Sequence, residues 1–85
     1  MRLHYYIPIR QDNCDAVLQK LTDSGYVLTF DNRKHGGKAH CLEVNIRGGV
    51  AVFGGGIPDN NHPCVISSDR AIELRNDFYI RVGHA

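Results

Sequence analysis

The sequence predicts an α+β fold in which one main amphipathic helix packs against a mostly antiparallel sheet of five to six strands. Three observations support this class. Apolar residues alternate with a period of two over most of the chain, which is typical of strands. A helical period appears only over residues 12–24, and glycine-rich turns separate the segments. A chain of 85 residues supports one hydrophobic core, so residues 1–85 are expected to form a single domain.

The order strand, helix, strand is expected at the start of the chain. Residues 2–9 alternate up to Pro8, which cannot donate to a ladder and so places this strand at an edge or ends it. An acidic cap region then begins the helix over residues 12–24. Its apolar residues recur at helical spacing, and they are Cys14, Val17, Leu18 and Leu21. Gly25 ends the helix, because glycine readily adopts the left-handed conformation.

Three further strands are expected in the middle of the chain, at residues 26–31, 38–47 and 50–53. Turn-forming residues separate the first two of these strands, so an antiparallel pairing is predicted that sets Phe30 opposite His40. Both strands would then bury the same face.

The expected register of the last two strands follows from Gly48 and Gly49. Both glycines can take a positive φ, which is typical of a two-residue hairpin turn. Such a turn sets Ala51 opposite Ile46 and directs Val50 and the residue two positions later away from the helix.

The last third of the chain fits two structures. Residues 64–66 form a short expected strand. Apolar residues then occupy even positions from Ile72 to Val82 around a turn at residues 75–77, and this alternation favours a hairpin. A possible second short helix at residues 68–76, capped by the polar run that begins at Ser67, is the alternative.

One face of the predicted sheet is expected to stay open. A helix of about 20 Å covers only part of five or six strands. The residues on the other face are too apolar for an ordinary solvated surface, so a homodimer through this face is the expected arrangement. The predicted interface residues are His4, Tyr6, Val27, Val50 and Val52.

Composition and charge exclude several classes of protein. Ten Lys and Arg residues against nine Asp and Glu residues give a formal net charge of +1, so no overall field draws the chain to nucleic acid or an anionic membrane. No apolar run resembles a secretory signal or approaches the roughly 18 residues that cross a bilayer. Three widely spaced cysteines without a CxxC pair favour reduced thiols, so a cytoplasmic protein is expected.

The sequence predicts a small binding or accessory protein that engages an unidentified macromolecular partner through the open sheet face or the loop at residues 54–63. This loop is long enough to indicate a function. Its candidate contact residues are Gly54, Gly55, Gly56, Asp59, Asn60 and His62. No GxSxG or HExxH motif is present, so an enzyme is not favoured, and no cofactor is predicted.

A metal-binding protein or an intersubunit enzyme around His62 and Cys64 is the first alternative. These residues lie two apart in the sequence, and with His40 or Cys41 they would offer ligands that fit zinc. Because His40 and Cys41 are neighbours in an expected strand, they point to opposite faces and cannot both hold one ion without a bulge.

Nucleic-acid binding by the turn at residues 33–38 is the second alternative. Arg33, Lys34 and Lys38 concentrate positive charge there and could contact phosphates without reading a sequence. No other basic cluster joins this turn, which makes a solvated turn the preferred interpretation.

Overall fold

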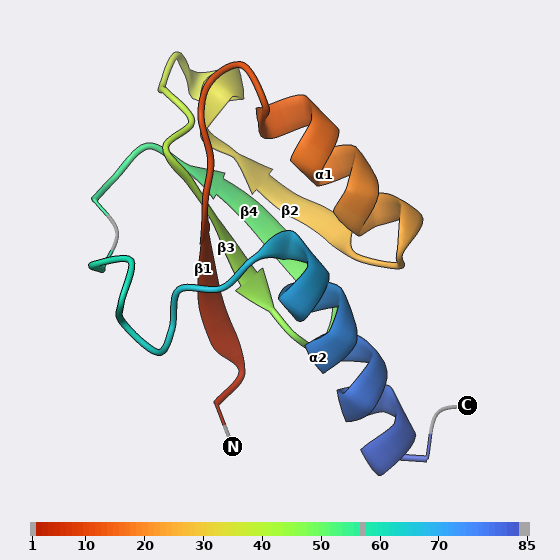
Figure 1. The fold of residues 1–85 in the computed structure, drawn as a ribbon. Helices are drawn as coiled ribbons and strands as arrows, with labels where there is room; N and C mark the ends of the chain where they lie inside the picture. Colours follow the sequence, from red (N-terminus) through yellow and green to blue (C-terminus); the bar gives the residue numbers. More distant parts are fainter. Residues whose placement is uncertain (1, 57, 84–85) are drawn as a thin grey trace.

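Four strands form one mixed sheet, and two helices cover one of its faces (Figure 1). The structure is a computed structural model that describes residues 2–56 and 58–83. The elements are β1 (His4–Pro8), α1 (Cys14–Asp23), β2 (Val27–Asp31), the 3₁₀ turn η1 (Asn32–His35), β3 (Cys41–Asn45), β4 (Gly49–Phe53) and α2 (Ser68–Arg81). The predicted α+β class is confirmed, whereas the expected count of five to six strands is too high. Within the described residues, neither helix has the length and apolar character needed to cross a membrane.

The strand order is β1-β3-β4-β2. β3 is antiparallel to both of its neighbours, but β2 lies at the edge and runs parallel to β4. The expected pairing of Phe30 with His40 is therefore wrong. The physical reason is local: the Asp31 carboxylate accepts a hydrogen bond of 3.0 Å from the backbone N–H of Arg33, which starts η1 in place of a hairpin. The chain then crosses to the middle of the sheet, where β3 forms.

The register of β3 and β4 also differs from the expectation. Asn45 lies opposite Gly49 and Val44 opposite Val50, around a turn in which Gly48 has a φ of 127°. This register is shifted from the predicted one by an odd number of residues, and an odd shift moves every side chain of a strand to the other face. Val50 and Val52, predicted at an open interface, are therefore core residues with 1% and 0% exposure.

The core lies between the helices and the sheet. α1 contributes its apolar stripe at Cys14, Leu18 and Leu21, as the helical spacing predicts. α2 contributes the fully buried Ala71. The sheet residues of this cluster are Ile7, Leu42, Val44, Val50 and Val52. Two helices thus bury one face of the sheet, and no helix of the described part of the chain lies on the other face (Figure 1).

The predicted hairpin at residues 72–82 is wrong, and the alternative helix is correct but longer than expected. The Ser67 hydroxyl accepts a hydrogen bond of 3.1 Å from the N–H of Arg70 and caps the start of α2. The apolar pattern was ambiguous because Leu74, Phe78 and Val82 lie four residues apart, and this spacing suits a helix as well as a strand. The expected strand at residues 64–66 is reduced to one bridge, between Val65 and Tyr6.

Arg75 fixes α2 to the turns at the start of β2 and β4. Its guanidinium carbon lies 4.4 Å from the ring centre of Tyr79 and 6.0 Å from that of Tyr26. The Tyr26 hydroxyl donates a hydrogen bond of 2.8 Å to the carbonyl of Ala71, and burial raises the pKa of Tyr26 to about 12. Gly25 has a φ of 105°, and a Cβ there would come within 2.7 Å of the guanidinium carbon. This glycine therefore serves both the turn and the approach of Arg75.

The register of β4 predicts opposite outcomes for two neighbouring substitutions. Val52→Lys places an unpaired charge in the core and should destabilise the fold by more than about 3 kcal/mol. Ala51→Lys places the same side chain on the open face opposite Glu43, so it should change stability by no more than about 0.5 kcal/mol. Urea unfolding followed by circular dichroism measures both values. Equal losses would contradict this register.

Candidate functional site

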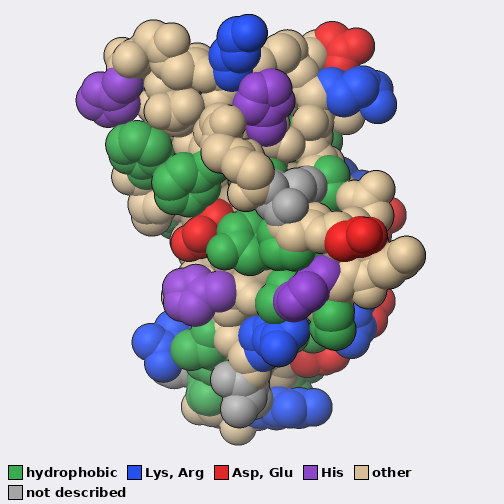
Figure 2. Space-filling view, turned by 90° about the vertical axis from the view of Figure 1, so that its left-hand side faces the viewer, with side chains coloured by type: hydrophobic (Ala, Val, Ile, Leu, Met, Phe, Trp, Pro, Cys, Tyr) green, Lys and Arg blue, Asp and Glu red, His purple; other side chains and the backbone are tan. Residues whose placement is uncertain are grey.

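The open face of the sheet and its β2 edge form the candidate binding surface. Figure 2 shows the side of the molecule away from the helices, where hydrophobic side chains lie among histidines and charges of both signs. Phe30 of β2 lies with its ring 5.8 Å from that of Phe53 of β4, and it stacks on His35 of η1 at 5.5 Å. Phe30 is 40% exposed and Phe53 is 36% exposed. This aromatic cluster was not expected from the sequence, because the wrong pairings placed both phenylalanines on the buried face of the sheet.

Glu43 lies between two shallow hollows of the open face. One hollow, of about 340 Å³, is lined by His4, Thr29 and Asn45 among others. The second, of about 190 Å³, is lined by Tyr6, Cys41, Phe53, Gly55 and Gly56, and Glu43 borders both. His4 approaches Glu43 at 3.9 Å, but His4 is exposed and Glu43 is partly exposed, so this pair adds little stability. His4 and Tyr6 thus lie on the open face, as the sequence predicts.

The edge strand β2 exposes an apolar run. Val27 is 65% exposed and Leu28 is 36% exposed, and Thr29 and Phe30 are also exposed. Within residues 2–56 and 58–83, this strand pairs only with its parallel partner β4. Such an edge carries backbone N–H and C=O groups that point away from the sheet. β2 therefore combines apolar side chains with hydrogen-bonding groups available to a further strand.

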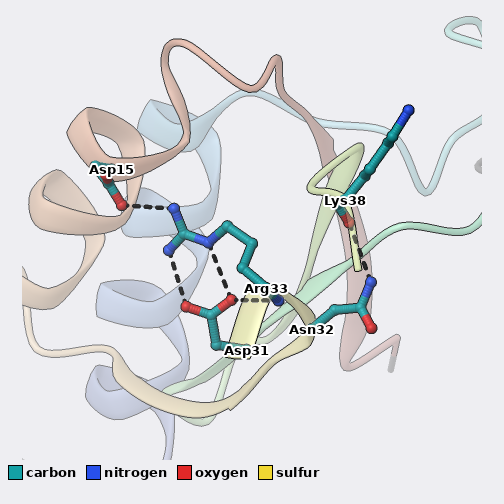
Figure 3. A network of polar contacts seen from close by, with 5 residues as sticks. All are labelled: Asp15, Asp31, Asn32, Arg33 and Lys38. Atoms are coloured by element: carbon teal, nitrogen blue, oxygen red, sulfur yellow. Dashed lines mark hydrogen bonds and ion pairs between the residues drawn. The ribbon is translucent and has the colours of Figure 1, made fainter. Parts of the chain in front are cut away.

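The Arg33 side chain forms ion pairs inside the protein (Figure 3). Its guanidinium donates to both carboxylate oxygens of Asp31, at 3.0 and 2.8 Å, and to Asp15 of α1 at 2.7 Å. These hydrogen bonds hold the pKa of the nearly buried Asp31 below its usual value, although burial opposes this. Lys34 and Lys38 are exposed. Of the three predicted nucleic-acid contacts, the structure thus places one in an ion-pair network that joins β2 to α1.

The residues of the alternative metal site do not form a ligand cluster in the structure. His62 accepts a hydrogen bond of 3.1 Å from the N–H of Cys64 through Nδ1, and the Cys64 sulfur accepts one of 2.9 Å from Arg2. His40 is exposed, while Cys41 is buried at the second hollow. Across residues 2–56 and 58–83, no group of three or more His, Cys, Asp or Glu side chains is placed to hold a metal ion.

The glycines and polar residues of the loop at 54–63 have separate roles. A Cβ on Gly54 would lie 2.5 Å from the Lys38 carbonyl oxygen, so this glycine allows close backbone packing. Gly55 and Gly56 line the second hollow. Asp59 accepts hydrogen bonds from the N–H groups of Asn61 and His62 in a local turn, and Asn60 is exposed within it. Ile57, inside the predicted loop, lies outside the described residues.

All three thiols are free. Cys14 and Cys41 are buried, and burial raises the pKa of both thiols. For Cys14, near the start of α1, the positive charge of Arg33 opposes this shift, but burial has the larger effect. Both groups therefore stay protonated near neutral pH and are poor nucleophiles. Cys64 is partly exposed.

The fold and this surface define a two-layer α+β protein with one open sheet face and one unprotected apolar edge. Comparison with family models, with curated proteins and with solved structures finds no match for the chain.

The Arg33 network predicts a specific loss of stability. Arg33→Gln leaves the Asp31 carboxylate nearly buried without its cation and should cost about 2 kcal/mol at pH 7. Because the pKa of Asp31 is lowered in the folded state, the wild-type pair stabilises fully above the ordinary value of about 3.9 and loses this contribution as the pH falls below it. Unfolding in urea at pH 7 and pH 3 should therefore show a difference between the two proteins that shrinks in acid. Lys34→Gln is the matched control, with an expected change within about 0.5 kcal/mol.

Burial also predicts which thiol reacts. In the native protein, Cys64 should react with 5,5′-dithiobis(2-nitrobenzoate) within minutes, and Cys14 and Cys41 should react only after denaturation, because reagent and thiolate are both excluded from the core. Cys64→Ser should abolish the fast phase. Fast labelling of the remaining thiols in that variant would contradict the burial of Cys14 and Cys41.

Proposed function

We propose that the protein is a small binding module that works as a homodimer, with two copies joined along their β2 edges. The observation that carries this proposal is the exposed run from Val27 to Phe30 on the edge strand β2, whose outer side pairs with no other strand of the described chain. The Val27 N–H donates to the Gly48 carbonyl at 2.7 Å, so the backbone groups of Leu28 point outward. A second strand can form backbone hydrogen bonds with Leu28.

The opposite edge of the sheet, at β1, is covered, whereas the β2 edge is exposed. β1 ends at Pro8, and residues 64–66 cover its edge. The Tyr6 N–H donates to the Cys64 carbonyl at 2.7 Å, and the Tyr6 carbonyl accepts from Ile66 at 2.9 Å. Proteins protect sheet edges by such coverage or by lysine and proline. Among the described residues, β2 has no covering segment, lysine or proline, and its ladder is interrupted at one irregularity, between Leu28 and Phe30. An edge with so little protection is suited to pairing with another chain.

A second copy of the chain fits this edge because the edge is self-complementary. Antiparallel pairing of two β2 strands about a twofold axis brings the start of one strand beside the end of the other. Asp23, the last residue of α1, precedes the start of β2, while the exposed Lys34 and His35 follow its end. Opposite charges would therefore meet at both ends of the paired strands. Short strands bury less than the roughly 1,200 Å² of a standard interface, so we expect a micromolar dimer.

The open face then becomes the surface for a macromolecular partner. Edge pairing joins two four-stranded sheets into one and leaves the aromatic cluster of Phe30, His35 and Phe53 exposed next to the hollows around Glu43. Of the interface residues predicted from sequence, Val27 belongs to the dimer contact, while His4 and Tyr6 belong to this face. Three free thiols support a reducing compartment, and we propose the cytoplasm.

Light scattering after size-exclusion chromatography tests the dimer. We expect the wild-type mass to rise from 9.5 kDa toward twice that value as the concentration is raised from about 1 to 500 µM. Val27→Lys should stay monomeric, because lysine on an edge strand opposes pairing.

The matched control is Ile80→Lys, at a residue that is 72% exposed and belongs to α2 rather than to the edge strand. It removes a similar exposed apolar side chain and should dimerise like the wild type. A wild-type protein that stays at 9.5 kDa throughout, or a Val27→Lys variant that still dimerises, would overturn the proposal.

A further inference from the structure

A cleft separates α2 from the sheet at the end of the molecule where β1 begins. Its cavity of about 180 Å³ is lined by Arg2, Tyr5, Ile46, Arg70, Leu74, Asp77, Phe78 and Arg81. The α2 members recur every three to four residues, so they share one face of the helix. Figure 1 shows the start of β1 and the last turn of α2 at the same end of the fold, which explains how residues from both ends of the chain line one cleft.

The cleft combines an apolar floor with a positive rim. The apolar part is formed by Tyr5 of β1, by Ile46 directly after β3, and by Leu74 and Phe78 of α2. Ile46 is only 4% exposed. Three arginines line the same cavity with a single carboxylate, that of Asp77. Like charges repel, so three guanidinium groups around one cavity create a positive field there that an anion would relieve.

Most N–H donors of these arginines are available. Arg70 uses Nη1 in an ion pair with Glu73, and Arg2 uses Nη1 on the Cys64 sulfur, which is a weak acceptor. Among the described residues, no carboxylate lies within ion-pair distance of Arg2 or Arg81. A guanidinium group has five donors arranged to bind carboxylate or phosphate oxygens in pairs.

We propose that this cleft binds a small aromatic anion: a single ring on the apolar floor that carries a phosphate or carboxylate group toward the arginines. The size agrees, because an apolar cavity of about 150 Å³ suffices to bind benzene. Arg81 and Arg2 bind the anionic group, and Phe78 and Tyr5 contact the ring. This site is separate from the β2 edge and does not depend on the proposed dimer.

Nuclear magnetic resonance titration of the full chain with phenyl phosphate tests the proposal. We expect shift changes at Tyr5, Ile46, Leu74 and Phe78 and a dissociation constant of about 0.1 to 1 mM, as suits a ligand of this size. Benzoate should bind at the same residues. Inorganic phosphate, which lacks the ring, and benzyl alcohol, which lacks the charge, should each bind at least about tenfold more weakly.

Single arginine variants separate this site from general surface charge. Arg81→Gln and Arg2→Gln should each weaken phenyl phosphate binding about tenfold, because each removes charge-assisted hydrogen bonds. Arg10→Gln is the matched control, since Arg10 is exposed and pairs with Asp12 outside the cleft. Unchanged circular dichroism verifies that each variant folds. Equal binding of inorganic phosphate and phenyl phosphate, an equal loss in Arg10→Gln, or shifts outside the cleft would overturn the assignment.

Discussion

The ion pair between Asp31 and Arg33 holds the turn that separates β2 from β3. Asp31 ends β2, caps η1 through the Arg33 backbone and binds the Arg33 side chain, which also reaches Asp15 of α1. Because the chain turns there in place of folding back as a hairpin, β3 forms between β1 and β4, and β2 stays at the edge. The exposed apolar edge is a consequence of this turn.

The sequence allows local elements to be predicted better than their pairing. The helical spacing of Cys14, Leu18 and Leu21 correctly predicts α1, because one apolar stripe on one helix is a local property. The register of β3 and β4 depends on whether the turn holds two residues or three, and one glycine pair suits both. α2 was ambiguous for another reason, since apolar spacings of two and of four coincide at even positions.

In the candidate surfaces too, local features could be predicted from the sequence, whereas features that depend on strand pairing could not. Val27 was predicted to be exposed from simple alternation, and it is. Phe30 and Phe53 could not be placed on the open face, because their orientation depends on the pairings and on an irregularity between Leu28 and Phe30 that has no sequence signal. The arginine cleft could not be predicted from the sequence, because Arg2 and Arg81 come together only when α2 packs beside the start of β1.

The strand order allows both proposed surfaces to act at once. β2 lies at one edge of the sheet, whereas the cleft residue Tyr5 belongs to β1 at the other edge and Ile46 directly follows β3. Two copies joined at β2 would therefore hold their clefts at the far ends of one continuous sheet. Ligand binding in the cleft and pairing at the edge share no residue, so each can fail in experiment without affecting the other. Arg75 packs α2 against the turns that begin β2 and β4, and the Tyr26 hydroxyl donates to the Ala71 carbonyl of α2, so these contacts link the helix of the cleft to the edge strand.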